Sequence, residues 1–436
     1  MTDRGAGAGP ARAAACAIWR AAVAAAEPRR LVTRALERLS AAGTLDIRGR
    51  LRVLGFGKAG AAMAQAVEDA LGERVADGFV VVKDGYTAPT RRIAVVEAGH
   101  PVPDARGLAA AERLLAHAAE AGPDDLVLVL ISGGGSALTP APEPPVTLAE
   151  KQAVTRLLLE AGATINELNA VRKHLSRLKG GRLARAAAPA RVVSLVLSDV
   201  IGDPLDVIAS GPTAPDPTTF GDALEVLARR GVKGLAPRSV LARLEAGARG
   251  ELEETPKPGD PIFARVDNLV IGNNALVVQA AAEEARRLGY RPHILDHAIE
   301  GEARTAAEEL VRRGRGLPAG ACLVAGGETT VTVRGPGRGG RCQELALAAA
   351  LALDAGAPLV VLAAGTDGTD GPTDAAGGLV DGGTVERGRR AGLDARRCLE
   401  ANDSYTFLRA AGDLLVSGPT NTNLLDLYLV VKPLPT

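Results

Sequence analysis

Residues 51–60 read Leu-Arg-Val-Leu-Gly-Phe-Gly-Lys-Ala-Gly, an apolar run that ends in glycines and leads directly into an alanine-rich stretch. Gly55, Gly57 and Gly60 satisfy G-x-G-x-x-G, a turn in which the backbone can approach a phosphate at a helix N-terminus. Taken alone, the pattern is equally consistent with a plain strand–turn–helix joint. Lys58 lies inside the loop of a chain with eight lysines and forty-three arginines. An enzyme that handles a transferring phosphoryl group would use a lysine there.

Length and composition exclude several classes of protein. The 436 residues are enough for two domains with their own cores. Aromatic residues make up only 2% and the net charge is zero, so neither base stacking nor general attraction to nucleic acid or anionic membranes is expected. Four widely spaced cysteines without C-x-x-C indicate a reduced, cytoplasmic protein. The charged N-terminal stretch predicts a helix and not a signal peptide, and no apolar run is long enough to span a membrane.

Short apolar runs alternate with helical stretches along most of the chain, which is the pattern of an α/β fold. Two helices, over 11–26 and 29–41, precede the first strand. The run 330–333 alternates β-branched residues and ends in Gly-Pro-Gly, so we expect an antiparallel or edge strand there. The expected strands are 51–55, 78–82, 93–96, 126–131 and 192–197, and then 268–271, 291–295, 322–325, 330–333, 359–363 and 427–431.

We therefore expect two α/β domains. Residues 46–250 should form a doubly wound, Rossmann-like parallel sheet, and residues 251–436 an α/β domain with a mixed sheet. The helices within residues 1–45 could pack on either domain. The stretch 253–261, with three prolines and a glycine, is the best candidate for a linker.

Several expected strands end in polar, glycine-rich loops, and in open α/β sheets ligands bind beyond the carboxyl ends of the strands. The strand 126–131 runs into Ser-Gly-Gly-Gly-Ser at 132–136, which could wrap a phosphate or carboxylate, although a tight turn would also account for it. Asp199 and Asp203 follow the strand 192–197, where a carboxylate could bind magnesium or accept a hydroxyl proton. For Asp203, capping of the next helix is an equally good interpretation.

Basic residues gather in one expected helix, residues 169–181, which should end in a glycine C-cap. Arg172, Lys173, Ser176 and Lys179 would lie near one face of that helix. The face could hold an anionic substrate, but a solvated charged face is the more common explanation. His100, in another loop after a strand, is more often structural than catalytic in such a setting.

The second half of the chain has similar loops. Arg341 opens a long Ala/Leu helix, where its charge adds to the positive end of the helix dipole and is unfavourable unless an anion is present. Asp367, Asp370 and Asp374 follow another strand. Their spacing fails the calcium-loop pattern, which leaves magnesium binding or a catalytic base. The loop 417–423 offers hydroxyls and amides to a small polar ligand. Together these are the components of phosphoryl transfer.

The chain resembles the class II glycerate kinases, a two-domain family whose C-terminal part is the MOFRL domain. The resemblance implies ATP- and Mg²⁺-dependent phosphorylation of D-glycerate on its 2-hydroxyl, in a cleft between the domains. The family's catalytic lysine, arginine and aspartate match Lys58, Arg341 and Asp367. The motifs that carry the resemblance are Gly-Phe-Gly-Lys-Ala (55–59), Ser-Gly-Gly-Gly-Ser-Ala (132–137), Ser-Asp-Val-Ile-Gly-Asp (198–203), Gly-Gly-Arg-x-Gln-Glu-Leu-Ala (339–346) and Gly-Thr-Asp-Gly-x-Asp-Gly-Pro-Thr-Asp-Ala-Ala-Gly (365–377).

From the motifs and the resemblance we expect three further groups of residues, with a homodimer left open. The family usually has Asn where this chain has Cys342, and Ser417 and Asn421 replace Thr and Gly of the usual C-terminal loop. Asn421 would be tolerated better than most residues if φ there is positive. The expected groups are Gly55, Gly57, Ser132, Gly133, Gly134, Gly135, Ser136 and Asn273 for the nucleotide; Arg172, Lys173, Thr420 and Asn423 for the substrate; and Asp199 and Asp203 for the metal.

Two other functions remain open at this point. An NAD(P)-dependent hydroxypyruvate reductase would use the glycine pattern, with Asp84 placed to bind a ribose. That function leaves Lys58, Arg341 and Asp367 without a task. A non-catalytic sugar-phosphate sensor would not need the cluster of aspartates.

Overall fold

The computed structural model describes residues 8–435, which form two compact units. Residues 28–271 form one, which we call the parallel-sheet unit. Residues 8–27 and 272–435 form the other, the mixed-sheet unit. In the described part of the chain, no helix combines the length and apolar character that crossing a membrane requires.

The parallel-sheet unit is built on six strands in the order β3-β2-β1-β4-β5-β6. All residues of β1 and β4 are buried, which explains why these strands are continuous apolar runs in the sequence. The chain adds β2 and β3 on one side of β1, then β4 and β5 on the other, so the loops after β1 and β4 flank the point where the strand order reverses. The strands are β1 (Leu51–Phe56), β2 (Val75–Lys83), β3 (Ile93–Ala98), β4 (Leu126–Ile131), β5 (Arg191–Leu197) and β6 (Val266–Gly272).

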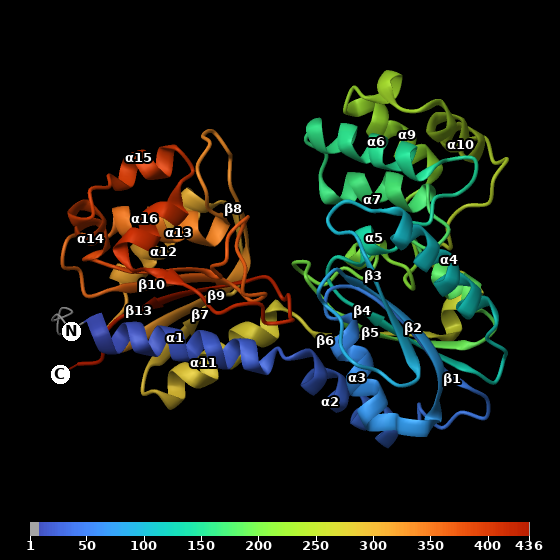
Figure 1. The fold of residues 1–436 in the computed structure, drawn as a ribbon, viewed down its shortest axis with the longest axis horizontal. Coiled ribbons are helices and arrows are strands. Elements are labelled where there is room, and N and C mark those ends of the chain that lie inside the picture. Colours follow the sequence, from blue (N-terminus) through green and yellow to red (C-terminus); the bar gives the residue numbers. More distant parts are fainter. Residues whose placement is uncertain (1–7, 436) are drawn as a thin grey trace. The chain divides into compact units, whose positions relative to one another are not determined.

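Helices cover both faces of this sheet (Figure 1). On one face, α4 and α8 bury alanine and leucine side chains against β1, β2 and β4. On the other, α3 packs on β1 and β4 and is itself covered by α2. The helices are α2 (Pro28–Ala41), α3 (Gly60–Leu71), α4 (Ala105–Ala119), α5 (Gly135–Leu138) and α8 (Arg182–Ala187).

A group of four further helices has a small core of its own beside this sheet (Figure 1). Three of them begin with a capping box, in which a threonine and an acidic residue satisfy each other's backbone N–H groups. Glu254, from the proline-rich stretch that the sequence indicated as a linker, accepts hydrogen bonds from Phe220 N and pairs with His174 inside this unit. The helices are α6 (Leu148–Glu160), α7 (Ile165–His174), α9 (Phe220–Arg229) and α10 (Arg238–Ala248), and short 3₁₀ helices are Gly72–Arg74, Ile208–Ser210, Lys233–Leu235 and Pro261–Arg265.

The mixed-sheet unit has seven strands, with the main path β12-β11-β10-β13-β9-β7 and β8 paired to β9. Pairing is antiparallel from β12 to β9, whereas β7 and β8 run parallel to β9. The mixed sheet predicted from the sequence is confirmed. The strands are β7 (Arg291–Ile294), β8 (Ile299–Glu302), β9 (Ala321–Thr330), β10 (Val360–Gly365), β11 (Gly377–Asp381), β12 (Leu414–Leu415) and β13 (Asp426–Val431).

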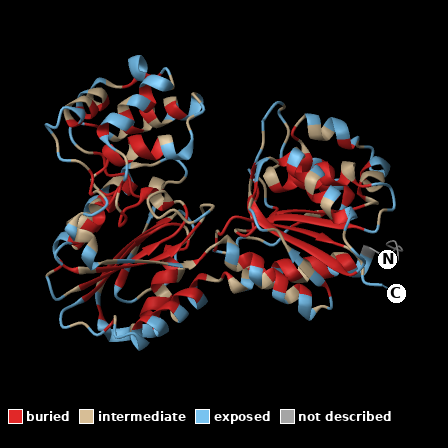
Figure 2. Cartoon of the chain, turned by 180° about the vertical axis from the view of Figure 1, so that it is seen from behind, coloured by how far each residue is buried: buried red, intermediate tan, exposed pale blue. Residues whose placement is uncertain are grey.

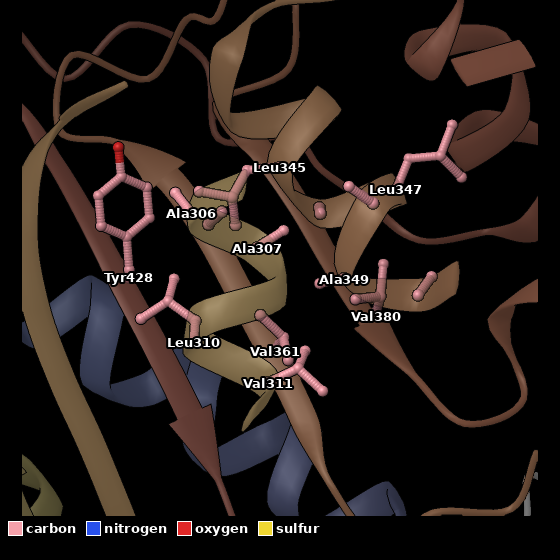
Figure 3. Close-up of a cluster of buried hydrophobic side chains, with 14 of the residues drawn as sticks. Ala306, Ala307, Leu310, Val311, Leu345, Leu347, Ala349, Val361, Val380 and Tyr428 are labelled. Carbon is pink, nitrogen blue, oxygen red and sulfur yellow. The ribbon is translucent and has the colours of Figure 1, made fainter. Parts of the chain in front are cut away.

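The core of this unit lies between its sheet and helices α12 and α13. Figure 3 shows Leu310 and Leu345 from these helices directed toward Val361 and Tyr428 on the strands. The central strands β9, β10, β11 and β13 are buried, while the outer faces of the helices are exposed (Figure 2). The helices are α1 (Ala8–Ala25) and α11 (Asn274–Arg287) on one face, and α12 (Ala303–Arg315), α13 (Arg341–Ala352), α14 (Thr384–Arg390), α15 (Ala395–Glu400) and α16 (Ser404–Ala411) on the other.

Helix α1 belongs to the mixed-sheet unit although it begins the described chain. It packs along α11 and against β10 and β13. Arg12 donates to Asp381 at 2.5 Å and to Asp413 at 2.7 Å, and both carboxylates are nearly inaccessible to solvent. The first helix therefore supplies a positive charge that neutralises buried carboxylates of the C-terminal half.

Two expectations about strands are wrong, the domain of one and the existence of another. The run 268–271, expected in the second domain, lies in β6 beside β5 of the parallel sheet, and the ion pair Arg191–Asp267 joins the two strands at 2.8 Å. The separate strand expected at 330–333 does not form, because β9 continues from residue 321 through two glycines to Thr330 and ends there. An apolar run in the sequence carries no information on which sheet it joins.

Candidate functional site

The loops after β1 and β4 interlock at the point where the strand order reverses. Gly57 has φ +127°, and a Cβ there would lie 2.2 Å from Ser132 Oγ. Lys58 N donates to Gly133 O at 2.9 Å, and Ala59 N donates to Ser132 Oγ at 3.1 Å. The backbone donors at the start of α3 are therefore used by the neighbouring loop, and they fix the position of Lys58.

The glycine pattern thus has a packing role in place of the phosphate contact predicted for Gly55 and Gly57. Gly55 lies inside β1, where a Cβ would approach Leu130 of β4 to 2.8 Å. The loop after β4 is different, because the amides of Gly133 and Gly134 donate to no acceptor in residues 8–435. That loop keeps the capacity to bind an anion that the sequence predicted for it.

Lys58, Gly134 and His100 lie together. A Cβ on Gly134, which has φ +85°, would come within 3.0 Å of the His100 imidazole and 3.5 Å of Lys58 Cγ. Burial and the positive charges of Lys58 and Lys83 lower the pKa of His100 to about 4, so its imidazole is neutral at physiological pH. Asp199 is half-buried and its pKa is raised by burial, with the charge of Lys58 acting in the opposite direction.

The neutral imidazole makes stability depend on pH. The unfolded chain protonates His100 below about pH 6.5, but the folded protein does so only near pH 4, so the unfolded state binds more protons between these values. Stability should therefore fall as pH drops from about 6.5 to about 4. His100→Gln should remove part of this loss, on the order of 1 kcal/mol. Urea unfolding at pH 7 and pH 4.5 measures it, and an unchanged difference between the two pH values would contradict the prediction.

The two residues predicted to bind metal, Asp199 and Asp203, would supply only part of a metal ion's ligands. Asp199 follows β5 near Lys58, and Asp203 lies farther along the same loop with φ +54°. No cluster of three or more His, Cys, Asp or Glu side chains suited to a metal occurs in the described residues. Mg²⁺ is commonly bound by one or two carboxylates together with phosphates of the substrate. Asp199 therefore fits such a site without a complete protein cage.

A cavity of about 330 Å³ opens beside Gly134. Lys151 and Lys179 lie in its wall, and both are almost completely buried. Lys179 Nζ donates to Ser136 O at 2.9 Å, and Lys151 Nζ to Leu175 O at 3.4 Å. Arg172, which the sequence predicted to bind substrate, also lines the cavity.

The neighbouring Lys173 has a structural role in place of the predicted substrate contact. It is 1% exposed, and its ammonium pairs with Asp206 and Asp216 at 3.2 Å each. The long basic helix expected over 169–181 is also wrong, because α7 ends at His174. Lys179 reaches the cavity from the following turn.

In the mixed-sheet unit, Arg341 is the first residue of α13, as predicted. Its Nε and Nη2 donate to the two carboxylate oxygens of Asp426, at 2.6 and 3.0 Å, and its Nη1 lies 2.7 Å from Glu328. Asp426 is 1% exposed. Burial opposes the charge of Arg341, but the bonds to Asp426 prevail and its pKa is raised. These carboxylates provide the anion that the sequence argument required at this helix end.

A different carboxylate, that of Asp370, caps the start of α13. Asp370 accepts hydrogen bonds from Cys342 N at 3.2 Å and Gln343 N at 2.8 Å. Burial, with a contribution from Asp426, raises the pKa of Asp370 to about 7. Cys342 is fully buried, so its departure from the family pattern concerns the core. Asp370 therefore holds the helix that begins with Arg341.

Removing this cap should destabilise the protein. Asp370→Ala leaves two buried N–H groups without acceptors, at an expected cost of about 2 kcal/mol. Asp370→Asn should lose less, because its carboxamide oxygen keeps one acceptor. Urea denaturation of the three proteins tests this, and equal stability of the alanine variant and the parent would rule out the capping role.

Asp367 lies in the turn after β10 and is half-buried. It accepts from Thr369 N at 3.0 Å. Thr420 N donates to Asp367 O at 3.1 Å, and Thr420 Oγ1 donates to Thr366 O at 2.5 Å, so the loop 417–423 is fastened to this turn. Asn421 has φ +60°, the left-handed conformation for which glycine or asparagine is suited.

The remaining residues predicted to bind nucleotide or substrate have different structural surroundings. Ser136 Oγ lies 3.0 Å from Ser210 Oγ, and Gly135 begins the short helix α5. Asn273 caps α11 by accepting from Leu276 N at 3.0 Å. Asn423 is half-buried in the loop before β13.

Sequence reasoning missed Lys151, Asp426 and the pairing of Glu328 with Arg341. A signal for Lys151 was available, since lysine is rare in this arginine-rich chain and the same rarity drew attention to Lys58. No local pattern pointed to Asp426, which reaches Arg341 through the pairing of distant segments.

Comparison with known proteins identifies the family. The model described as Domain of unknown function (DUF4147) matches residues 14–245, and the MOFRL family model matches residues 321–426. Glycerate 2-kinase of Pyrococcus horikoshii is 43% identical over 423 residues, which cover 94% of each chain. The chain belongs to the glycerate 2-kinase family. The crystal structure of a glycerate kinase from Thermotoga maritima is similar to it with a TM-score of 0.86 and 41% identity, over 97% of this chain and 99% of that one.

Members of the glycerate 2-kinase family have also received another name. A protein of Agrobacterium vitis named putative hydroxypyruvate reductase is 45% identical to this chain, over 95% of it and 93% of the relative. The two names describe different chemistry, so the geometry of the glycine loop has to decide between them.

Proposed function

We infer that this protein is a glycerate 2-kinase, which transfers a phosphoryl group to the 2-hydroxyl of D-glycerate and yields 2-phospho-D-glycerate. The observation that carries the inference is the likeness to glycerate kinases over nearly the whole chain. We propose ATP as the donor and Mg²⁺ as the metal. In the reaction, the 2-oxygen bonds to the γ-phosphorus, the bond from that phosphorus to the β–γ bridging oxygen breaks, and the hydroxyl proton passes to a base.

Lys58 is proposed to neutralise charge on the transferring phosphoryl group. The interlocked loops hold its backbone, which limits how far its position varies. Asp199 would hold the metal, which when bound neutralises phosphate charge. Preorganised charge of this kind supplies most of the catalysis in phosphoryl transfer.

Arg341 is proposed as a second cation that neutralises phosphate charge in the reaction. The side-on pairing with Asp426 fixes the plane of its guanidinium. Asp367 would orient or deprotonate the 2-hydroxyl, supported by Thr420 and with Asn423 as a further substrate contact. Arg172 is proposed to contribute charge from the parallel-sheet unit.

The geometry of the glycine loop argues against a reductase. A dinucleotide fold binds the pyrophosphate with amides at the start of the helix after β1, but Lys58 N and Ala59 N already donate to protein acceptors. Asp84, the expected ribose ligand, forms a two-pronged pair with Arg106 at 2.7 and 2.8 Å. A pure sensor would have no need of turnover.

Product analysis tests the function. The protein is incubated with ATP, Mg²⁺ and D-glycerate, and the products are resolved as 2- or 3-phosphoglycerate by ³¹P NMR. We expect 2-phosphoglycerate. A parallel reaction with hydroxypyruvate and NADH is followed at the nicotinamide absorbance. Oxidation of NADH at enzyme-like rates without phosphorylation of glycerate would establish the reductase, and ATP turnover without added partners would count against a sensor.

A further inference from the structure

The cavity beside Gly134 is lined by basic side chains that have no carboxylate partner among the described residues. Lys151, Arg172 and Lys179 all line it, and no carboxylate of the described residues lies within ion-pair distance of any of them. Glu143, whose charge acts weakly on Lys151, is instead shared by Arg182 at 2.5 Å and Arg243 at 3.6 Å. The neighbouring Arg182 and Arg243 are thus paired with a carboxylate, but Lys151, Arg172 and Lys179 of the cavity wall are not.

This arrangement is unfavourable without an anion. Burial lowers the pKa of Lys151 to about 7 and that of Lys179 well below its usual value, and mutual repulsion adds to both shifts. Burial also lowers the pKa of Arg172. Keeping these groups protonated in a buried site costs free energy, and an anion in the cavity would offset that cost.

Part of the exposed lining of the same cavity is apolar, next to the exposed side chain of Arg156. Val102 and Leu159 are 63% and 56% exposed, and Pro103 and Leu148 line the cavity beside them. These two exposed side chains belong neither to the core under α4 and α8 nor to that of the four-helix group. A ligand that is anionic at one end and apolar at the other would satisfy both the floor and the rim.

The size of the cavity distinguishes between glycerate and the nucleotide, the two anions of the proposed reaction, as its occupant. A cavity of about 330 Å³ lies at the lower end of the range of about 300–1,000 Å³ typical of sites for drug-sized ligands. Glycerate has three carbons and a single carboxylate, so it would leave most of the cavity and most of its positive charge unused. A nucleoside polyphosphate has both the volume and the charge.

We propose that this cavity is the nucleotide site. Arg172, Lys151 and Lys179 bind the phosphate chain together with the free amides of the loop after β4, and the base packs on Val102 and Leu159. The phosphate end then lies at Gly134, beside Lys58. The proposal rests on the proposed kinase function and reassigns Arg172 from substrate to nucleotide.

Calorimetric binding of ADP, without glycerate, tests the site. Arg172→Gln should weaken binding by about 10- to 100-fold, since a charge-assisted hydrogen bond is lost. Leu159→Asp should weaken ADP binding by about tenfold. Its affinity for inorganic tripolyphosphate should stay close to that of the Leu235→Asp control. The matched controls are Arg191→Gln and Leu235→Asp, an exposed arginine and an exposed leucine away from the cavity, which should bind ADP like the parent.

Each other result overturns the site. If Arg172→Gln raises KM for glycerate and leaves ADP binding unchanged, the cavity holds the substrate carboxylate. If neither ligand is affected, the cations serve the fold alone. Circular dichroism melting confirms that each variant is folded. ADP binding is measured without turnover, so a parent protein that binds ADP in this way but does not phosphorylate glycerate would refute the kinase function and not the nucleotide site.

Discussion

Replacement of Lys58 with methionine is expected to lower kcat for glycerate phosphorylation by about 10²- to 10³-fold, the usual effect of removing a group that stabilises transition-state charge. Lys58 lies in the loop after β1, where the strand order reverses, and its backbone N–H donates a hydrogen bond to Gly133 O. Methionine keeps the length and the apolar stem of lysine and removes only the charge. The fold should therefore be retained.

Steady-state kinetics with ATP and D-glycerate measure this effect. Lys233→Met is the matched control, because Lys233 is an exposed lysine paired with Glu245 at 3.4 Å. It should keep the parent's turnover. A folded Lys58→Met variant with turnover near that of the parent would falsify the catalytic assignment of Lys58.

Arg341→Lys is expected to lower kcat by about 10²-fold even though the positive charge remains. An ammonium cannot reproduce the side-on pairing with both oxygens of Asp426. The same change should destabilise the protein by about 1–3 kcal/mol, because the nearly inaccessible Asp426 carboxylate loses hydrogen bonds.

A double variant separates the two effects. Arg341→Met alone leaves the Asp426 carboxylate with the Tyr428 hydroxyl but without a cationic partner. Arg341→Met with Asp426→Asn removes the unpaired negative charge as well. We expect the double variant to be more stable than the single one in urea, with turnover equally low in both. Recovery of turnover in the double variant would show that Arg341 acts only through folding.

The sequence was most informative where a residue's role is local. The strand over residues 126–131 was predicted with its observed limits because all its residues are apolar and buried. Short or glycine-containing strands such as β8, β11 and β12 were missed, since they carry no strong apolar pattern. They form only by pairing with β9, β10 and β11, respectively. The helix end at His174 was missed because the basic residues continue with helical spacing beyond it.

Long-range charge could not be predicted. Lys173 and Lys179 are similar in the sequence, but the carboxylates Asp206 and Asp216 pair with the first and leave the second facing the cavity. Arg341 was identified from its place at a helix start, whereas Asp426 lies 85 positions away along the chain. Which basic group is neutralised depends on tertiary structure that no motif records.

The packing of α1 on the mixed-sheet unit has a consequence for synthesis of the chain. Because residues 28–271 form a separate unit, they interrupt the other unit's sequence as an insertion. At typical elongation rates of about 5–20 residues per second, the ribosome needs on the order of tens of seconds to deliver the partners of α1. Until Asp381 and Asp413 emerge, Arg12 has neither carboxylate to bind. The inserted unit can fold in that interval, so the order of folding should run from the middle of the chain outward.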